Sequence, residues 1–278
     1  MEKKDKVVLF DGAAGSLLWS MAEEKGIKRV STWKYNIEAP ELVFNMHKKY
    51  IEAGADMIQT NTFAVNKASV ARESSYSVKE VVAAAVDIAM RAAEGTGVEV
   101  YLSSGPLTDL LEPFGNLSEE ECADCYREII SVAVEKGVKT VLLETFMDLE
   151  MMKIAATVAK EFGVKVICSL TFEARHRTMM GNSVAQICAD LEEIGVDAVG
   201  MNCSKGPAES MEIIKEFSET TDLSLFFKPN TGMGVSYGAL QFADEITPAL
   251  SFVSYVGGCC GTDEQYIKEL RKRIDALA

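Results

Sequence analysis

The chain has 278 residues, of which 48% are hydrophobic and 25% charged, and its formal net charge is -14. This composition is ordinary for a globular protein with a large core, and the length allows one large domain or two small ones. The strong negative charge argues against nucleic acid or an anionic membrane surface as a partner.

The sequence shows no recognisable targeting or membrane segment. The apolar run near the start covers only 7–10 before Asp11 interrupts it. The longest uncharged stretch near the end, 246–262, contains Pro248 and is shorter than the roughly 20 apolar residues that a spanning helix needs. We therefore predict a cytoplasmic protein whose seven cysteines stay reduced and serve packing, metal binding or catalysis.

Short apolar runs rich in Val, Ile and Leu alternate along the chain with segments of helical period. Near-continuous hydrophobicity is typical of strands buried on both faces of a parallel sheet. Eight such units without a linker favour a single (β/α)8 TIM barrel of the α/β class, spanning residues 1–278, over a doubly wound open sheet. The predicted strands are 7–11, 57–62, 99–105, 140–144, 165–172, 198–203, 224–229 and 252–257.

Capping signals mark the helices between these strands. Ser118, with Glu121 three residues later, forms a capping box, and we expect Thr262 and Gln265 to repeat it at the last helix. The weakest unit is 243–250, a short helical stretch that contains a proline. Helices are expected to end at four glycines, because glycine readily adopts the left-handed conformation found there. These glycines are Gly54, Gly137, Gly163 and Gly195.

Three cysteines fall at strand ends, where the active site of such a barrel lies. Cys203 ends the sixth strand, and Cys259 and Cys260 follow the eighth within Gly-Gly-Cys-Cys-Gly. Cys203 alone would more often be a small buried hydrophobe, but adjacent cysteines pack poorly and the flanking glycines permit unusual backbone. We expect the three sulfurs to converge over the barrel mouth. Three thiolates with a fourth position open predict catalytic zinc, which would hold an incoming thiol as a thiolate for alkylation.

Two carboxylates also fall at strand ends, where such groups are costly unless solvated or paired. Asp11 and Glu144, after strands one and four, are expected either to bind a ligand ammonium group or to form salt bridges with a Lys or Arg at the mouth. The stretch 12–16 offers backbone N–H groups that can bind a carboxylate. It has neither the Gly-x-Gly-x-x-Gly spacing nor a Walker lysine, so nucleotide binding is not indicated.

Other chemically active side chains are assigned to packing or solvent. Cys122 and Cys125 have Cys-x2-Cys spacing, but they lie in a predicted helix and no second pair is present. His47 is expected on a helix as a packing or surface residue. His176 lies in a loop at the active end, where a solvated basic loop is a more ordinary role than proton transfer.

A set of sequence blocks carries a family resemblance over nearly the whole chain. The most specific blocks are Asn202-Cys203 and the segment 256–262, Val-Gly-Gly-Cys-Cys-Gly-Thr. The other matching segments are 10–12 with Gly15, 52–56, 60–63, 144–146 and 228–230 with Gly232. The chain resembles the homocysteine S-methyltransferase family. The nearer branch is the N-terminal homocysteine-binding domain of cobalamin-dependent methionine synthase, and betaine–homocysteine methyltransferase is more distant.

The resemblance implies a zinc-bearing barrel with Cys203, Cys259 and Cys260 as ligands. Homocysteine thiolate would take the fourth position and attack a methyl donor to give methionine. Asn230 matches a position that can occupy zinc when substrate is absent.

The resemblance also implies how the rest of the substrate is held. Its amino group would lie near Asp11 and Glu144. Its carboxylate would lie near the backbone of Ala14 and Gly15.

The methyl donor stays open at this point. No folate-binding or cobalamin-binding module is expected in the chain, so a methylcobalamin (corrinoid) protein acting in trans, with a possible folate-binding subunit, is the first expectation. S-Methylmethionine, S-adenosylmethionine or a betaine is the second, and another thiol acceptor is the third. Outside this class, the chain would be a zinc or redox sensor in which Cys259 and Cys260 form a strained disulfide, or a subunit that only binds homocysteine.

Overall fold

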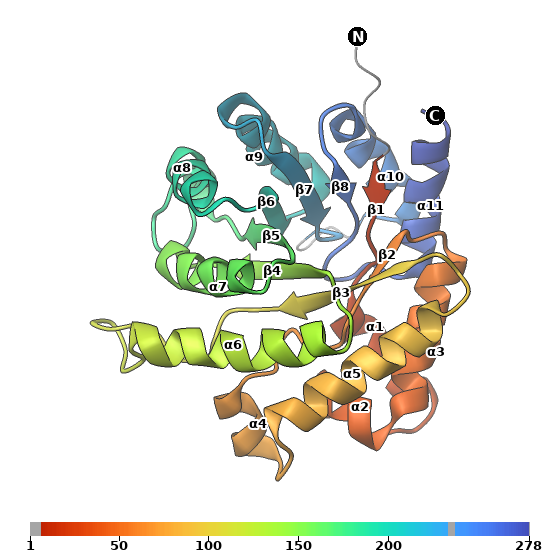
Figure 1. Cartoon of the computed structure of the whole chain (residues 1–278). Helices are drawn as coiled ribbons and strands as arrows, with labels where there is room; N and C mark the ends of the chain where they lie inside the picture. The colour runs from red at the N-terminus through yellow and green to blue at the C-terminus, as the bar shows by residue number, and fades with distance from the viewer. Residues whose placement is uncertain (1–6, 233–236, 278) are drawn as a thin grey trace.

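The computed structural model describes residues 7–232 and 237–277 and confirms the predicted (β/α)8 barrel (Figure 1). The charged start that entered the targeting prediction, residues 1–6, lies outside the described residues. Eight parallel strands follow the order β1-β8-β7-β6-β5-β4-β3-β2, and a parallel bridge from Phe10 to Met57 joins the two outer strands. The strands are β1 (Val8–Leu9), β2 (Met57–Gln59), β3 (Glu99–Ser104), β4 (Thr140–Phe146), β5 (Lys165–Leu170), β6 (Ala198–Cys203), β7 (Ser224–Pro229) and β8 (Tyr255–Val256).

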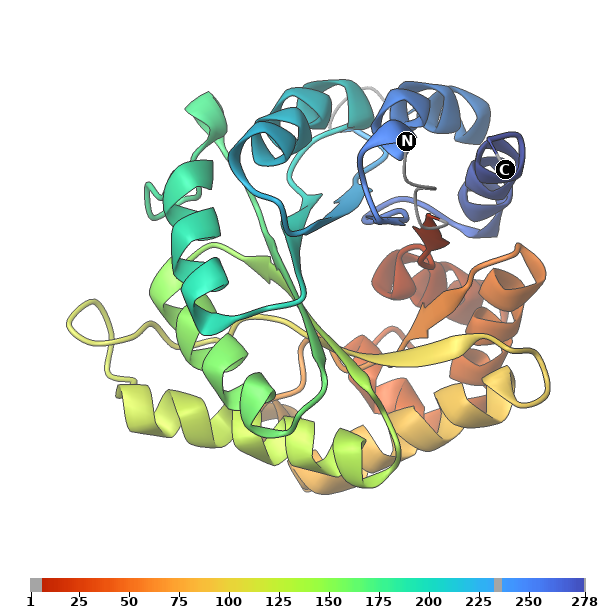
Figure 2. The same cartoon turned by 45° about the horizontal axis from the view of Figure 1, so that its top comes forward.

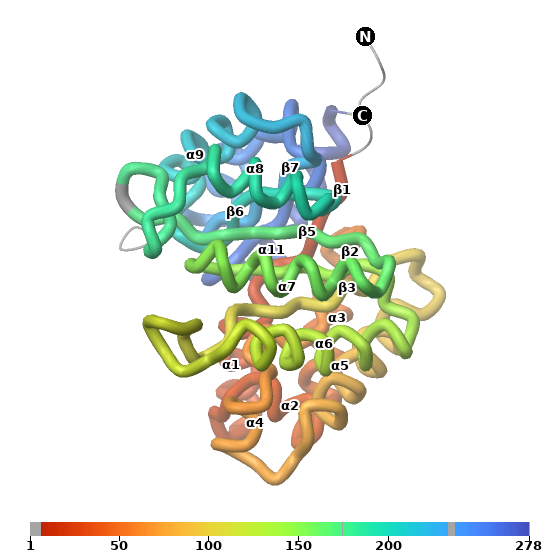
Figure 3. Tube along the Cα trace, turned by 60° about the vertical axis from the view of Figure 1, so that its left-hand side comes forward, coloured from red at the N-terminus to blue at the C-terminus, as the bar shows by residue number. Residues whose placement is uncertain are grey.

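Helices surround the strands as an outer ring (Figure 2). They are α1 (Ala14–Glu24), α2 (Tyr35–Glu38), α3 (Pro40–Glu52), α4 (Lys67–Glu73), α5 (Val78–Ala93), α6 (Glu119–Glu135), α7 (Leu149–Glu161), α8 (Val184–Ile194), α9 (Pro207–Thr220), α10 (Ala239–Ile246) and α11 (Glu264–Asp275), with 3-10 turns η1 (Thr32–Lys34), η2 (Ala174–His176) and η3 (Thr247–Ser251). Successive helices pack side by side, α5 on α6 and α6 on α7 (Figure 3). Within the described ranges, we find no helix with the length and apolarity needed to cross a bilayer.

One of the two predicted capping boxes is confirmed and the other is wrong. At α6 the Ser118 hydroxyl accepts from the Glu121 N–H, and the Glu121 carboxylate accepts from the Ser118 N–H. At α11 the cap is Asp263, whose carboxylate accepts from the Gln265 N–H at 2.9 Å. Thr262 does not cap the helix because its hydroxyl donates to the Cys259 carbonyl at 2.8 Å. The last helix therefore starts one residue later than a Thr262 cap would set it, and Thr262 belongs to the cysteine loop.

The predicted helix ends at glycines are confirmed, since all four glycines have positive φ. Gly195, with φ 78°, closes α8 by donating its N–H to the carbonyls of Leu191 and Glu192. The short unit 243–250 consists of the end of α10 followed by η3, and Pro248 lies at the start of that 3-10 turn. Proline fits there because the first turn of a helix needs no N–H from it.

The barrel interior changes from apolar to polar along the strands. Its apolar part comprises Phe10, Met57, Tyr101, Leu142, Ile167, Ala198 and Phe226. Two residues further along five of these strands, on the same face, lie the buried polar residues Gln59, Ser103, Glu144, Ser169 and Lys228. The ring of Phe10 packs on Tyr101 and Phe226, with centroid distances of 4.7 and 5.2 Å. An aromatic layer therefore forms the floor beneath the polar mouth.

The capping box at α6 makes a stability prediction. Replacing Ser118 with alanine should lower the free energy of unfolding by about 1 kcal/mol, because the Glu121 N–H loses its acceptor. Urea denaturation measures the change. Ser131→Ala, a matched substitution inside the same helix, should cost nothing measurable because alanine is the better helix former. Equal losses in the two variants would contradict a specific role for the cap.

Candidate metal centre and active site

The three cysteines at the barrel mouth lie together in space. Cys203 is the last residue of β6, and Cys259 and Cys260 follow β8. Pro229, at the end of the intervening β7, pairs with Cys203 in the sheet register and accepts the Cys259 N–H at 2.9 Å. The Sγ atoms of Cys203 and Cys260 are 3.5 Å apart, and all three sulfurs lie within 4.8 Å of one another. Soft ligand atoms this close can bind a single metal ion.

Unusual backbone sets this arrangement. Cys203 and the following Ser204 have φ values of 56° and 62°, in the left-handed region that costs a non-glycine residue about 1 kcal/mol or more. Before the cysteine pair, Gly258 packs so tightly that a Cβ there would lie 2.5 Å from the Thr262 hydroxyl oxygen. The same hydroxyl accepts the Ala13 N–H at 3.1 Å. The glycines therefore let the cysteine loop lie directly against the end of β1.

This close packing predicts that Gly258→Ala disturbs the metal site. The added methyl group must displace Thr262, which holds the Cys259 carbonyl, so zinc affinity should fall by about tenfold or more. Competition with a chromogenic zinc chelator measures the effect. Gly238→Ala, at a glycine whose Cβ would meet open space, serves as the control and should keep its zinc affinity. Unchanged affinity in the Gly258 variant would show that the loop tolerates the methyl group.

The residues around the cysteines fit a zinc ion. The side-chain oxygen of Asn230, directly after β7, is buried without a hydrogen-bond partner among the described residues. Its neighbour Thr231 donates its N–H to the Cys260 carbonyl at 3.1 Å, so the asparagine adjoins the thiols. An unpartnered buried acceptor next to three thiols is the donor set that a thiophilic cation satisfies. The thiols of Cys203 and Cys259 lower the pKa of Cys260, because both can donate to its thiolate.

Glu144 lies beside this centre at the end of β4 and is 5% exposed. The Ser103 hydroxyl donates to one carboxylate oxygen, and the Asn202 amide lies 3.4 Å from the other. Burial raises the pKa of Glu144 to about 7, because the raising effects of burial, Cys259 and Asp11 outweigh the lowering effects of Lys228 and Ser103. A positive charge placed beside Glu144 would therefore stabilise the ionised form of its carboxylate.

Asn202 connects Glu144 to the cysteines. Its side-chain oxygen accepts from the Thr145 N–H and the Ser169 hydroxyl, both at 2.8 Å. Its amide nitrogen lies 2.7 Å from the Thr145 hydroxyl and 3.6 Å from the Cys259 sulfur. Thr145 itself has φ 65°. This network orients the side chains around the thiols as outer-shell hydrogen bonds do in metal sites.

Asp11 is completely buried and lies below the cysteine loop. One carboxylate oxygen accepts from the Tyr101 hydroxyl at 2.7 Å and pairs with the Lys228 ammonium at 3.2 Å. The other accepts the Gln59 N–H at 2.8 Å. Burial lowers the pKa of Lys228, but the charges of Asp11, Glu144 and Cys259 outweigh it and raise that pKa. Burial also raises the pKa of Asp11, and this effect outweighs the lowering effects of Lys228, Gln59 and Tyr101. The contact between Asp11 and Lys228 is one of the two arrangements expected for this aspartate.

The stretch after β1 leads directly into α1, which begins at Ala14. Tyr50 donates its hydroxyl to the Ala13 carbonyl at 2.8 Å and fixes this turn. The first amides of a helix have no intrahelical acceptor and carry a partial positive charge. The N–H groups at Ala14 and Gly15 are therefore placed at the mouth side of the barrel, where a carboxylate can bind.

The sequence pattern described as homocysteine S-methyltransferase matches residues 8–274, nearly the entire chain. The chain belongs to the homocysteine S-methyltransferase family. The family is the one that the sequence blocks resembled.

Similar proteins of this methyltransferase family include the methionine synthases of Mycobacterium leprae (strain TN) and Mycobacterium tuberculosis. They are 29% and 28% identical over 97% of the chain, which covers 24% and 25% of their lengths. The chain thus spans about a quarter of the length of the curated relatives that it matches. The homocysteine methyltransferase MmuM of Escherichia coli has the same fold, with TM-scores of 0.77 for its apo form and 0.82 for its metallated form. Its identity is 22% and 21%, over 97% of both chains.

Away from the barrel mouth, Cys122 and His47 are buried as packing residues, in line with expectation. Cys122 and Cys125 lie on α6, as predicted. His47 is fully buried in α3, and burial lowers its pKa to about 3. His176 contacts Glu216 of α9 at 2.7 Å, so the loop after β5 is held by an acidic helix and is not simply solvated.

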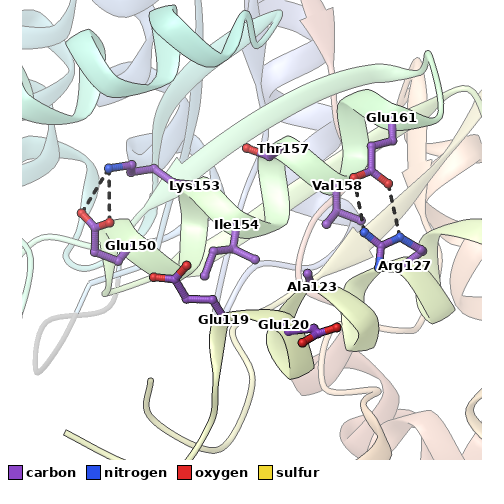
Figure 4. Close-up of a pocket in the computed structure, with 10 residues that line it drawn as sticks. All are labelled: Glu119, Glu120, Ala123, Arg127, Glu150, Lys153, Ile154, Thr157, Val158 and Glu161. Atoms are coloured by element: carbon purple, nitrogen blue, oxygen red, sulfur yellow. Dashed lines mark hydrogen bonds and ion pairs between the residues drawn. The ribbon is translucent and has the colours of Figure 1, made fainter. Parts of the chain in front are cut away.

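A groove between α6 and α7 lies on the flank of the barrel and is lined by charged side chains (Figure 4). Two ion pairs cross it or border it, Arg127 with Glu161 and Lys153 with Glu150. None of the three mouth cysteines lines this groove. Its lining is a surface charge pattern, and the chemistry of the site lies at the barrel mouth.

Sequence reasoning assigned no role to three residues of the mouth: Tyr101, Asn202 and Lys228. A signal was present for two of them. Tyr101 and Lys228 occur on strands whose alternate residues point into the barrel, so a lysine two residues after buried Phe226 had to enter the interior. A buried lysine in turn requires an anion.

Exposed apolar side chains occur in four of the loops that follow the strands. We call this set the apolar rim: Phe63, Leu110, Phe114, Met147, Met179 and Met180. They lie in the loops that follow β2, β3, β4 and β5, hence on the face that carries the cysteines. Phe114 is 74% exposed. Exposed apolar side chains on one end of a domain offer contact area for a partner.

Proposed function

We propose that this chain is a zinc-dependent enzyme that transfers a methyl group to homocysteine and releases methionine. The observation that carries the proposal is the group of three thiols, Cys203, Cys259 and Cys260, within 4.8 Å at the barrel mouth. The family to which the chain belongs supports homocysteine as the acceptor. Such thiols function only when reduced, which agrees with the predicted cytoplasmic location.

Zinc bound by the three thiolates would keep the homocysteine thiol ionised at neutral pH. The remaining work falls to the chain itself. Glu144 has no cation at contact distance among the described residues and would bind an ammonium group directly, whereas Asp11 would do so in exchange for its contact with Lys228. The amides of Ala14 and Gly15 would bind the carboxylate. Asn230, whose buried side-chain oxygen has no hydrogen-bond partner among the described residues, would help to hold the metal in the absence of substrate. In the transfer, a sulfur–carbon bond forms while the bond from the methyl group to the donor breaks, and the donor keeps that electron pair.

We further propose that the donor is methylcobalamin carried by a separate corrinoid protein, with a folate-binding subunit as a possible source of methyl groups. Two observations support a corrinoid protein as the donor. The chain is similar to two methionine synthases over 97% of its length. The exposed apolar side chains in the loops after β2, β3, β4 and β5 also offer contact area for a large partner. S-Methylmethionine, S-adenosylmethionine and betaine are the small-molecule alternatives.

A donor panel tests the proposal. The zinc-loaded protein is incubated with homocysteine and each donor in turn, and methionine is measured. We expect turnover with methylcobalamin protein and little with the small donors. Turnover with S-methylmethionine alone would identify that compound, and not methylcobalamin, as the methyl donor. Tight homocysteine binding without turnover for any donor would show that the chain is a binding subunit. A different thiol acceptor would show itself as faster turnover with that thiol.

The second candidate function is a redox sensor, favoured by one distance. The Sγ atoms of Cys203 and Cys260 are 3.5 Å apart, so these two cysteines are placed for a disulfide when metal is absent. Metal analysis under reducing conditions separates the two functions. One zinc per chain supports the enzyme, and a metal-free protein that reversibly forms this disulfide supports the sensor.

A further inference from the structure

Asn202 is fully buried at the end of β6, directly before the first of the three mouth cysteines. It lies on the same face of the strand as Ala198, which belongs to the apolar part of the barrel interior. From this position its side chain contacts residues of β4, of β5 and of the loop after β8. One amide group therefore joins three separate parts of the mouth.

The orientation of this amide is fixed by its neighbours. The backbone nitrogen of Thr145, which can only donate, lies 2.8 Å from one side-chain atom of Asn202, so that atom has to be the oxygen. The Ser169 hydroxyl donates to the same oxygen at 2.8 Å. The amide nitrogen therefore faces the other way, toward the sulfur of Cys259.

The amide nitrogen carries two hydrogens, and the contacts around it assign both. One hydrogen is donated to the Thr145 hydroxyl, whose oxygen lies 2.7 Å away. The other faces the Cys259 sulfur at 3.6 Å and a carboxylate oxygen of Glu144 at 3.4 Å. A nitrogen–oxygen distance of 3.4 Å is longer than that of an ordinary hydrogen bond, whereas sulfur has a larger radius and accepts at longer distances. The sulfur is therefore the better acceptor for this second hydrogen.

This contact makes the three mouth cysteines unequal. Among the described residues, only Cys259 has its sulfur in contact with a side-chain amide, while the sulfurs of Cys203 and Cys260 contact each other at 3.5 Å. A thiolate is both the metal ligand and the nucleophilic form of cysteine. A hydrogen bond donated to a thiolate stabilises the charge that would otherwise drive its attack on a methyl group. Cys259 should therefore react more slowly than it would without this contact.

We propose that Asn202 is a positioning residue that donates its second amide hydrogen to the Cys259 sulfur and makes this thiolate a poorer methyl acceptor than the substrate sulfur. This inference rests on the proposed function, because it requires a methyl donor and thiolates that bind a metal. Methylation of Cys259 would form a sulfur–carbon bond at a metal ligand and weaken the site. The hydrogen bond opposes this side reaction, and the contacts to Thr145 and Ser169 keep the donor in place.

Methyl iodide tests the proposal on the zinc-loaded protein without homocysteine. A cysteine sulfur attacks the methyl carbon, and iodide leaves with the electron pair of the carbon–iodine bond. Mass spectrometry of the digested protein gives the methylation rate of each cysteine, and the measured quantity is the rate at Cys259 divided by the rate at Cys203. Asn202→Leu removes the donor at nearly constant volume, so this ratio should rise by about tenfold or more.

Two further variants show whether the donor itself matters. Ser169→Ala removes a hydrogen bond to the Asn202 oxygen but keeps the amide donor, so the ratio should change little. Asn116→Ala, at an exposed asparagine before α6, should leave it unchanged. A merely structural role of Asn202 would speed methylation of Cys203 and Cys259 alike in Asn202→Leu, and the unchanged ratio would overturn the proposal. An equal rise of the ratio in Ser169→Ala would also overturn it.

A second measurement uses the wild-type protein and so holds where a variant fails to fold or loses its metal. With a magnetic isotope of cadmium in place of zinc, a hydrogen bond from Asn202 to Cys259 transmits a scalar coupling from the metal through the sulfur to the amide proton. NMR should detect this coupling on one of the two side-chain amide protons of Asn202. If the wild-type protein binds neither zinc nor cadmium, the proposed function fails and the inference fails with it. Metal binding with resolved amide signals but no coupling overturns the inference alone.

Discussion

Cys260→Ala should lose zinc and methyl transfer together. The thiol of Cys260 lies 3.5 Å from that of Cys203, and its removal leaves two thiols and Asn230 around the ion. Loss of an outer-shell partner typically weakens metal binding by about 10- to 100-fold, and loss of a direct ligand should exceed that range. Zinc content after dialysis, together with methionine formed from homocysteine, measures both effects.

Cys125→Ala is the matched control for this prediction. Cys125 is a half-buried thiol on α6, on the outer ring of helices, and its loss should leave zinc content and turnover unchanged. Full zinc and full turnover in the Cys260 variant would refute the metal site. Retained zinc with lost turnover would assign Cys260 to the reaction and not to metal binding.

The fold was predictable because its strands are buried on both faces. Such strands are near-continuous apolar runs, and their number and spacing identify the barrel without further information. Their lengths were less predictable. The run 7–11 forms strand only at Val8–Leu9, and 252–257 only at Tyr255–Val256. The apolar runs in the sequence are longer than the strands because residues outside the strands, such as Phe10 and Val253, are also buried by packing.

The cysteine cluster was predictable for a local reason. Cys259 and Cys260 are adjacent, flanked by glycines and placed at a strand end, and all three facts are visible in a few residues of sequence. The Asp11–Lys228 pair was not predictable in this way. The two residues are 217 positions apart and meet only when β1 and β7 curve around the barrel. The sequence required an anion for a buried lysine, but it did not say which carboxylate would supply it.

The failed capping box at Thr262 has the same origin. Thr262 satisfies the local pattern for a helix cap, yet its hydroxyl is used by Ala13 and Cys259, 249 and three residues away. A tertiary contact therefore overrides the local signal. The helix start moves by one residue to Asp263, which accepts from Gln265. Local rules fail here because the residue serves the metal loop, which is where exceptions are expected.

Glu144→Gln should raise the KM for homocysteine by about 10- to 100-fold, because a charged hydrogen bond to the substrate ammonium group becomes neutral. The value of kcat should change much less, since the sulfur is held by the metal site and not by Glu144. Steady-state kinetics with a saturating donor separate the two constants. Glu150→Gln, an exposed carboxylate on α7, is the control and should leave both unchanged.

Glu144 also leads us to expect that the number of protons released on homocysteine binding depends on pH. Burial raises the pKa of Glu144 to about 7, so below that pH the free protein carries a proton there. An incoming ammonium group favours the carboxylate and expels this proton. Homocysteine binding should therefore release about one proton at pH 8, from the thiol alone, and approach about two near pH 6. The affinity for homocysteine should correspondingly weaken as pH falls through 7.

Calorimetry in two buffers of different ionisation enthalpy counts these protons. In Glu144→Gln the count should stay near one across the range, because only the thiol ionises on binding. A count that still rises toward two in this variant would place the second proton on another group. A count of one at every pH in the wild-type protein would mean that Glu144 is already ionised before the substrate arrives. The proton count thus tests the charge state of the carboxylate independently of any methyl donor.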